Sequence, residues 1–385
     1  MSVSSIPTDV RYRLWGKAAG RCQYRGCNTP LWIDGLTKAE FNIAYLAHII
    51  ADKPDGPRGD AKLSPLLSKD ISNIMLLCDA HHRLIDKKDV DGHPAELLQE
   101  MKKEHEKRIE LITEMDMDRE THVVLFGTNI GDHSSPLNKN SVYPTLKIEK
   151  RYPAQVEPIA LNLDNSLFKD DDEFFWTVET KNLQQQFKEK IEPLLSKNAK
   201  HFSLFGIAPQ PLLIELGKLF SDIPVVETFQ RQREPEPTWE WSECKESTYI
   251  VKEPEMIQDK VALIISLSAT ITNDRIVSVL GEDISIWTLT IDNPNNDFLK
   301  SKQQLSEFRK TFRKLLDDIK YHHGQNNEIH IFPAAPVAIN IEIGRVWMPK
   351  ADLPMKIYDQ NYKKGGFQYA LTIQYALTTE AIFFD

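Results

Sequence analysis

The stretch that organises this chain reads Ile74-Met75-Leu76-Leu77-Cys78-Asp79-Ala80-His81-His82-Arg83-Leu84-Ile85-Asp86. Its first four residues form an apolar run that is short enough for a buried strand. Cys78 and His81 follow with C-x-x-H spacing, at which two ligands can hold one zinc ion from a tight turn. His82 comes next, and Asp86 lies four residues later, on the same face if a helix begins here. The stretch therefore predicts a closed zinc site beside a second histidine–aspartate pair.

The other zinc ligands are predicted near the N-terminus. Cys22 and Cys27 form a C-x4-C knuckle, and with Cys78 and His81 they make the four-ligand set of a structural zinc site. Cys244 stands alone in the sequence. In a reducing compartment this pattern favours a metal over a disulfide. The alternative is a set of buried thiols and a surface histidine that hold no ion.

Three residues, His48, Asn73 and His82, suit the hydrolysis of a phosphodiester. That reaction needs an activated water, a cation on the scissile phosphate and a base that is free of the metal. His48, near the end of a strand expected over residues 42–50, suits the base, and Asn73 suits an orienting partner for the backbone or the imidazole. His82 and Asp86 suit one divalent ion, Mg²⁺ or Mn²⁺. The alternative is that His48 is structural, which is the commoner role of a lone histidine on a strand.

Length and composition are those of an ordinary globular protein. A chain of 385 residues with 41% hydrophobic and 27% charged residues predicts two or three domains. Neither a membrane span nor a signal peptide is visible, so a cytoplasmic protein without a membrane partner is expected. The net charge of −9 argues against a generally basic nucleic-acid binder. Contact with DNA would have to come from a local basic face or from several copies together.

The C-terminal two-thirds contains an internal repeat. One copy reads Phe205-Gly206-Ile207-Ala208-Pro209-Gln210-Pro211, Glu215-Leu216-Gly217-Lys218-Leu219-Phe220, Pro224 and Gln230, and the other reads Phe332-Pro333-Ala334-Ala335-Pro336-Val337-Ala338, Glu342-Ile343-Gly344-Arg345-Val346-Trp347, Pro354 and Gln360. The offset is 127 residues to the end of the second block and 130 after it. Amphipathic helices at about 181–197 and 302–322 precede the copies, and a strand is expected over 261–268. This α/β pattern predicts two tandem Rossmann-like units; chance similarity of two strand–turn–helix units is the alternative.

The segments between these regions give weaker signals. Helices are expected from Pro7 and over residues 94–114, with Pro7 suited to a first helical turn. Residues 128–158 are rich in Gly, Ser, Asn and Pro and lack helical periodicity, so loops are expected there. The junction between domains is expected near residues 115–125.

Candidate ligand-binding residues lie where strands of the repeat end. Open α/β sheets bind ligands at the carboxyl ends of their strands, and the helix that follows such a strand favours phosphate at its N-terminus. Arginine and lysine offer further cations there, and tryptophan offers a flat face for a base. The alternative is that the cations form solvated surface and the tryptophans belong to the core. The candidates are Pro209, Gln210, Arg231, Trp239, Ser268, Ala335, Pro336 and Lys364.

The N-terminal motifs resemble those of the HNH endonucleases in their zinc-braced ββα-metal form. The matching residues are Ala47-His48-Ile49, Asn73, and Leu77-Cys78-x-x-His81-His82-x-x-x-Asp86, and the resemblance covers roughly residues 10–110. It implies an α+β domain with a structural zinc and a catalytic metal. Many of these enzymes place an acidic residue or a histidine before the base as a metal ligand, and here that position is Ala47. Either Asp86 or a carboxylate of residues 52–60 must then complete the ion, or metal binding is weak until DNA phosphate arrives.

The C-terminal region resembles the SAVED domain, a fusion of two CARF-like units that senses cyclic oligonucleotides. The matching stretches are Gly206-Ile207-Ala208-Pro209, Leu216-Gly217, Trp239-Glu240-Trp241, Ile265-Ser266-Leu267-Ser268 and Pro333-Ala334-Ala335-Pro336. The two resemblances imply an HNH domain over residues 1–120 and a SAVED domain over 121–385, with pseudo-repeats at about 121–255 and 256–385. This is the layout of effector nucleases in cyclic-oligonucleotide-based anti-phage signalling systems (CBASS).

The expected function is therefore a metal-dependent endonuclease for double-stranded DNA that a cyclic di- or trinucleotide activates. Cutting both strands takes two HNH sites, so a homo-oligomer, a dimer or larger, is expected on activation. The alternative is a ligand-responsive, zinc-containing DNA-binding regulator without nuclease activity. His48 distinguishes the two, because a binding module has no use for a free imidazole beside a metal site.

Overall fold

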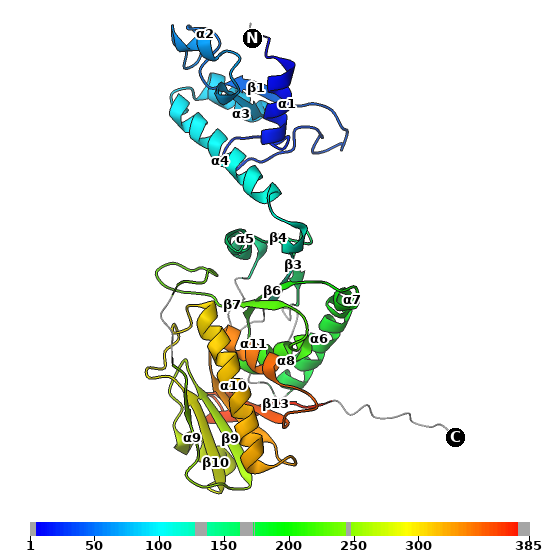
Figure 1. Cartoon of the computed structure of the whole chain (residues 1–385), viewed down its shortest axis with the longest axis vertical. Coiled ribbons are helices and arrows are strands. Elements are labelled where there is room, and N and C mark those ends of the chain that lie inside the picture. The colour runs from blue at the N-terminus through cyan, green and yellow to red at the C-terminus, as the bar shows by residue number, and fades with distance from the viewer. Residues whose placement is uncertain (1–4, 128–136, 162–171, 173, 244–247, 376–385) are drawn as a thin grey trace, which may run out of the picture. The chain divides into compact units, whose positions relative to one another are not determined.

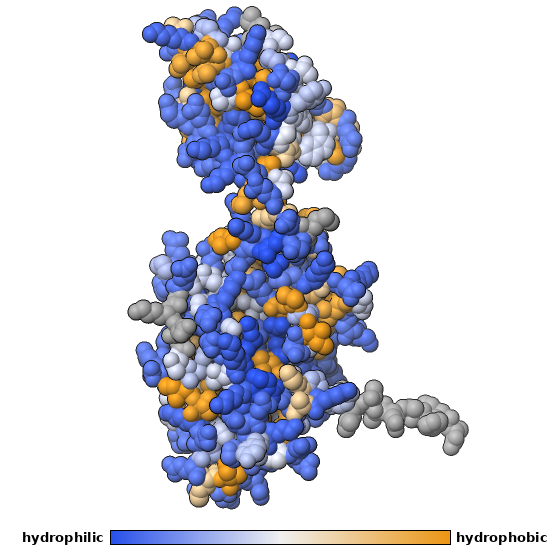
Figure 2. Space-filling model, in the orientation of Figure 1, coloured by the Kyte–Doolittle hydropathy of each residue, from blue (hydrophilic) through white to orange (hydrophobic). Residues whose placement is uncertain are grey.

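The computed structural model describes residues 5–127, 137–161, 172, 174–243 and 248–375. It divides the chain into two compact units, Met1–Asp116 and Met117–Asp385 (Figure 1). Among the described residues, none of the helices combines the length and the apolar character that a membrane span requires. The face drawn in Figure 2 is mainly hydrophilic and carries separate apolar patches, as is usual for a protein surface.

The N-terminal unit is built around one pair of short antiparallel strands. Its elements are α1 (Thr8–Lys17), β1 (Tyr45–His48), α2 (Leu63–Leu67), the 3-10 turn η1 (Ile71–Asn73), β2 (Ile74–Leu77), α3 (Asp79–Arg83), the π-helical turn η2 (Leu84–Lys88) and α4 (Ala95–Thr113). In the strand pair, Ala47 lies opposite Met75 and His48 lies opposite Ile74. All four residues of β2 are buried, as the apolar run predicted, and they pack against Leu14 of α1 and Leu98 of α4.

The C-terminal unit begins with a parallel sheet in the order β4-β3-β6-β7, in which β5 also pairs with β3. The strands are β3 (Glu120–Gly127), β4 (Tyr152–Pro153), β5 (Ile159–Ala160), β6 (Phe202–Ile207) and β7 (Val226–Phe229), and the turn η3 (Met117–Arg119) precedes them. The helices of this half are α5 (Lys139–Ile148), α6 (Phe175–Lys190), α7 (Glu192–Ser196) and α8 (Gln210–Phe220). Helix α5 packs on one face of the sheet, and α6 and α8 pack on the other.

The second sheet has the order β13-β12-β11-β9-β10-β8, with parallel inner strands and an antiparallel strand at each edge. Its elements are β8 (Ile250–Lys252), β9 (Lys260–Ser266), α9 (Asn273–Leu280), β10 (Ile284–Thr290), α10 (Lys302–His323), β11 (Ile329–Ala334), α11 (Val337–Val346), β12 (Met355–Asn361) and β13 (Gly366–Ile373). Helix α9 covers one face, while α10 and α11 cover the other. The C-terminal region therefore has the α/β fold that the repeat predicted.

Helices α8 and α11 lie against each other between the two sheets (Figure 1). Gly217 and Gly344, which are equivalent in the repeat, stand where the two helices cross. A Cβ atom on Gly217 would lie 1.9 Å from the carbonyl oxygen of Ile341, and one on Gly344 would lie 1.9 Å from the carbonyl oxygen of Ile214. Both positions therefore require glycine because the backbones themselves are in contact.

The prediction of loops throughout residues 128–158 is wrong at α5. Asn138 and Ser141 form a capping box at its start, which satisfies backbone donors of the first turn. Val142 and Leu146 are buried against the sheet, so packing holds the helix in spite of Pro144 within it. The residues 128–136 of the same expected loop lie outside the described part of the chain.

We expect Gly217→Ala to destabilise the C-terminal unit toward the upper end of the range of about 1–3 kcal/mol that overpacking usually costs. The added methyl group meets a backbone oxygen, which cannot move away as a flexible side chain would. Urea unfolding followed by circular dichroism measures the change. Gly16→Ala in α1 is the control, since its Cβ would meet no atom within 4 Å. Equal stability of the two variants would contradict the tight helix crossing.

Candidate functional site

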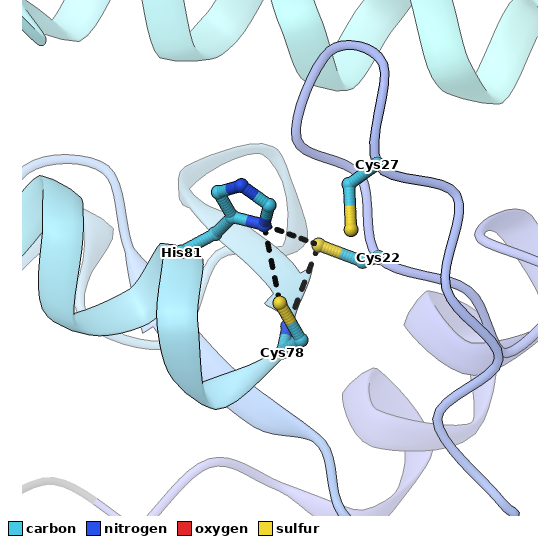
Figure 3. Close-up of side chains that lie close together, drawn as sticks. All are labelled: Cys22, Cys27, Cys78 and His81. Atoms are coloured by element: carbon cyan, nitrogen blue, oxygen red, sulfur yellow. Dashed lines mark hydrogen bonds between the residues drawn. The ribbon is translucent and has the colours of Figure 1, made fainter. Parts of the chain in front are cut away.

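Cys22, Cys27, Cys78 and His81 converge in the N-terminal unit, and their ligand atoms all lie within 4.8 Å of one another (Figure 3). Nδ1 of His81 is 3.1 Å from Sγ of Cys78 and 3.7 Å from Sγ of Cys22. A tetrahedral zinc ion with Zn–S distances of about 2.3 Å needs donor atoms at roughly such separations. Three thiolates and one imidazole also form a closed donor set, which is typical of structural zinc. The residues present therefore fit a zinc ion.

The backbone brings the two halves of this cluster together. Gln23 follows Cys22 and binds Leu76 of β2 twice: its N–H donates to the Leu76 carbonyl (2.9 Å), and its Oε1 accepts from the Leu76 N–H (2.8 Å). This pairing places Cys22 beside Cys78, which comes two residues after Leu76. Gly26 lies between the two cysteines of the knuckle with φ +83°, a conformation that glycine adopts without strain. The C-x4-C turn therefore folds back onto the end of β2.

The environment of the cluster suits a cation. Burial raises the pKa of the Cys22 thiol far above its ordinary value, so the thiolate that a metal needs forms there only with a compensating charge. Burial likewise lowers the pKa of His81, which favours the neutral imidazole that binds a metal. Tyr24 stacks on the His81 ring with centroids 4.0 Å apart, and its hydroxyl lies 3.0 Å from Nε2 of His93. These contacts fix the orientation of the ring.

His48 lies at the end of β1 with only 8% of its surface exposed. Its Nε2 is 2.8 Å from the carbonyl oxygen of Ser68, and because a carbonyl only accepts, Nε2 must carry the proton. Nδ1 is then the ring atom with a free electron pair. His48 also lines a cleft of about 720 Å³. This hydrogen bond therefore selects the Nε2–H tautomer of the neutral imidazole.

Asn73 is buried, with 1% of its surface exposed, and it binds the chain rather than the cleft. Its Oδ1 accepts from the Ile50 N–H and its Nδ2 donates to the Ile50 carbonyl, both at 2.8 Å. Nδ2 also lies 3.3 Å from the Leu67 carbonyl, next to Ser68. Asn73 therefore joins the backbone at Ile50, two residues after His48, to the backbone at Leu67, next to Ser68.

His82 and Asp86 lie together in the same cleft. Nε2 of His82 is 3.3 Å from Oδ2 of Asp86, and the ring of Tyr45 stacks on His82 with centroids 4.6 Å apart. Nη2 of Arg58 donates to Oδ1 of Asp86 at 2.7 Å. Burial opposes ionisation of Asp86, but the hydrogen bonds from His82 and Arg58 outweigh it and hold the pKa of this carboxyl below its usual range.

The cleft carries charges of both signs. The residues that line it are Tyr45, Leu46, Ala47, His48, Ala51, Asp52, Lys53, Asp55, Gly56, Pro57, Asp79, His82, Arg83, Asp86 and Lys87. Two of its carboxylates already bind arginine: Asp79 pairs with Arg83 at 2.9 Å, and Asp86 pairs with Arg58. The basic residues that line it are Lys53, Arg83 and Lys87.

In the C-terminal unit the two Ala-Pro loops meet. Pro209 and Pro336 precede the first residues of α8 and α11, and Gln210 bridges the loops. Its Nε2 donates to the Pro333 carbonyl (3.1 Å), and its Oε1 accepts from the Ala335 N–H (2.9 Å). The predicted convergence of the loops is therefore seen, but the Gln210 side chain already uses polar groups that were expected to face a ligand.

The other predicted ligand-binding residues take no part in the hydrogen bonds of Gln210. The Ser268 N–H donates to the Ala334 carbonyl at 2.7 Å, which ties the end of β9 to the second loop. Arg231 and Trp239 line a small pocket of about 250 Å³ with residues of α5. Trp239 is only 3% exposed and packs edge-on against Phe205, so it belongs to the core as the alternative held. Lys364 is exposed in the turn between β12 and β13.

Several residues of these sites escaped the sequence analysis. Arg58 and Ser68 lie in the chain between β1 and β2, where only carboxylates were considered, and Tyr45 gave no signal beyond its place in the strand. Their roles depend on contacts made across the fold. Asn340 of α11 likewise joins Gln210, with Nδ2 3.1 Å from its Oε1. Cys244 lies outside the described residues.

We expect one tightly bound zinc ion per chain, and we expect Cys78→Ser to unfold the N-terminal unit rather than merely alter a rate. A closed four-ligand site contributes folding free energy directly. Elemental analysis of the purified protein measures the metal, and circular dichroism measures folding. Cys244→Ser, which removes the cysteine outside both sequence knuckles, is the control. A folded protein without zinc would contradict the prediction.

Comparison with known proteins identifies the C-terminal unit. Residues 183–373 match the family model of the SMODS-associated and fused to various effectors sensor domain, SAVED. No curated protein sequence matches the chain. Among solved structures, the chain is similar to the Acinetobacter baumannii Cap4 SAVED/CARF-domain containing receptor with the cyclic trinucleotide 2'3'3'-cAAA (12% identity, TM-score 0.43, 76% of this chain and 65% of that one). It is also similar to the same receptor with 3'3'3'-cAAA (12% identity, TM-score 0.41, 76% and 66%).

The chain thus spans just under two thirds of the length of these receptors. The family match covers the second half of the first sheet and nearly all of the second, including both Ala-Pro loops and the α8–α11 crossing. Residues 183–373 are thus similar to the SAVED sensor domain.

Proposed function

We propose that the protein is a metal-dependent endonuclease for double-stranded DNA, and that a cyclic di- or trinucleotide bound by its SAVED domain switches cleavage on. In this proposal it is an effector of CBASS anti-phage immunity. The nuclease half of this proposal rests on the N-terminal unit. Its control half, activation by a ligand, rests on the match of residues 183–373 to the SAVED sensor family.

The observation that carries the nuclease half is the tautomer of His48. Its Nε2–H is committed to the Ser68 carbonyl, so Nδ1 has a free electron pair in a cleft that also holds His82. A base in this state takes a proton from a water molecule that attacks the scissile phosphate. The order of elements supports the assignment, since the antiparallel strands β1 and β2, with α2 and η1 between them, precede α3 as a strand pair precedes the helix in a ββα-metal domain.

His82 would hold the divalent ion of this site. It lies in the same cleft as His48, and a Mg²⁺ or Mn²⁺ ion there would stabilise negative charge on the phosphate. Tyr45 on one ring face and Asp86 at the ring edge keep His82 in place. The residue before the base is Ala47, whose methyl side chain has no atom that can bind a metal.

The charge balance favours activity by an assembled form. Lys53, Arg83 and Lys87 offer cations beside the cleft, but carboxylates surround them and the whole chain carries −9. One copy therefore attracts DNA weakly. Two or more copies could combine their basic groups into one groove and supply the two sites that a double-strand break requires.

We expect His48→Ala to lower cleavage by about 10²–10⁴, the usual loss when a general base is removed. A plasmid-nicking assay with Mg²⁺ and a panel of cyclic nucleotides measures it, and zinc content with circular dichroism checks that the variant is folded. His322→Ala is the control because His322 is an exposed histidine of α10, in the other unit. Cleavage by His48→Ala at the normal rate would refute the assignment. Ligand-dependent DNA binding without cleavage by the unaltered protein would favour the regulator.

We expect at least one of the variants Arg231→Ala and Lys364→Ala to raise the activator concentration needed for cleavage. Each residue lies near the carboxyl edge of a sheet, where such folds bind ligands. Lys350→Ala is the control, because Lys350 is an exposed lysine that precedes β12 and therefore lies toward its opposite end.

Sedimentation with and without activator accompanies that assay. A ligand shifts an equilibrium only by its differential affinity for the two states, so activator and self-association must promote each other. Full cleavage without activator, or one unchanging particle size throughout activation, would show that the control half is wrong.

A further inference from the structure

We propose that Asp86 does not bind the catalytic metal but orients His82, and that Arg58 fixes Asp86 for this task. This inference rests on the proposed nuclease function, because it assigns Nδ1 of His82 to the metal. It replaces the expectation that His82 and Asp86 are ligands of one ion.

Arg58 is a buried cation that donates hydrogen bonds to three acceptors in the same region. Its side chain is 7% exposed. Nε donates to the Ile49 carbonyl (2.6 Å), Nη1 to the Ile85 carbonyl (2.7 Å) and Nη2 to Oδ1 of Asp86 (2.7 Å). The residue itself has φ +58°, a left-handed conformation that is unfavourable for arginine and that the surrounding contacts must maintain. Arg58 thus joins the end of β1 to the turn that carries Asp86.

The π-helical turn η2 leaves the carbonyl oxygen of Ile85 available to accept a hydrogen bond from Arg58. In this turn the Asp89 N–H bonds to the Leu84 carbonyl five residues earlier, a pattern that interrupts the regular α-helical ladder. The Ile85 carbonyl then accepts a hydrogen bond from Nη1 of Arg58. The turn and the arginine together set the position of Asp86.

Both oxygens of Asp86 are engaged. Oδ1 accepts from Arg58, and Oδ2 faces Nε2 of His82 at 3.3 Å. A divalent ion on this carboxylate would have to approach the fixed guanidinium charge, and the repulsion between the two cations opposes that. The carboxylate is therefore placed to accept the Nε2–H of His82.

The hydrogen bond from Nε2–H to Asp86 decides which nitrogen of His82 can bind a metal. With Nε2 protonated, Nδ1 alone has a free electron pair in the neutral ring. Histidines that bind metals usually donate their other N–H to a carboxylate in this way, and loss of the carboxylate typically costs about 10–100-fold in metal affinity. Asp86 and Arg58 are thus positioning residues, and they act through His82.

Asp86→Asn tests the inference without changing the size of the side chain. An amide offers one oxygen to two converging donors, and the charged Arg58 is the stronger competitor for it. The amide NH₂ then faces His82 and donates to Nε2, so the His82 proton moves to Nδ1. We expect this change of tautomer in long-range ¹H–¹⁵N spectra of full-length, histidine-labelled protein that keeps its zinc and receives no Mg²⁺ or Mn²⁺. The His82 signal is assigned by its absence in His82→Gln.

The second measurement is Mn²⁺ affinity, which we expect to fall about 10–100-fold in Asp86→Asn. Asp91→Asn is the matched control, since it removes the same charge from an exposed position outside the cleft lining and should change neither reading. Arg58→Lys keeps the charge but donates from a single nitrogen atom, which cannot take the places of Nε, Nη1 and Nη2 together, so we expect a mixture of the two tautomers.

The possible results separate this inference from the nuclease proposal. Mn²⁺ binding together with an unchanged Nε2–H tautomer in Asp86→Asn would overturn the role of Asp86 and leave the nuclease intact. A wild-type tautomer in Arg58→Lys would overturn the role of Arg58. An unaltered protein that shows the Nε2–H tautomer but binds no Mn²⁺ and cuts no DNA would overturn the nuclease proposal and, with it, the assignment of Nδ1.

Discussion

The backbone contact between Gly217 and Gly344 is the constraint on which the sensor unit depends. Each glycine lies in a helix that starts directly after an Ala-Pro loop, so the closeness of the two helices also sets the separation of the two loops. Only at this separation can Gln210, at the start of α8, reach the backbone of the second loop at Pro333 and Ala335. Two side chains at the crossing would part the repeats and open the region where the ligand is expected.

The N-terminal unit depends on a different constraint. Its sheet has two strands of four residues each, which alone would be marginally stable in water. A zinc ion held by the Cys₃His cluster would tie the knuckle at Cys22 and Cys27 to the junction of β2 and α3, as a metal does in small domains with limited cores. Because His82 follows His81, such an ion would also help to position the proposed catalytic histidine.

The sequence was informative where the spacing of a few residues, or a repeat, directly reflects a structural requirement. The ligand spacing predicted the Cys₃His cluster, and the repeat predicted the paired helices because Gly217 and Gly344 meet the same steric demand. Prediction from the sequence failed where contacts between residues far apart in the chain determine the structure. Nothing local marks Arg58 as the partner of Asp86, since its guanidinium is held by the carbonyls of Ile49 and Ile85, which lie elsewhere in the chain. Pro144 indicated a loop, yet burial of one face of α5 outweighed that local preference.

The state of the proposed catalytic groups bears on how a ligand could control them. His48 is already held in one tautomer by Ser68, and His82 is already held by Tyr45 and Asp86, all within one copy of the N-terminal unit. A ligand on the SAVED domain therefore has no misaligned imidazole to correct. What a single copy lacks is a strong positive field for DNA and a second site for the opposite strand. Under the proposed function, control through assembly would supply both and would leave the chemistry of each site unchanged.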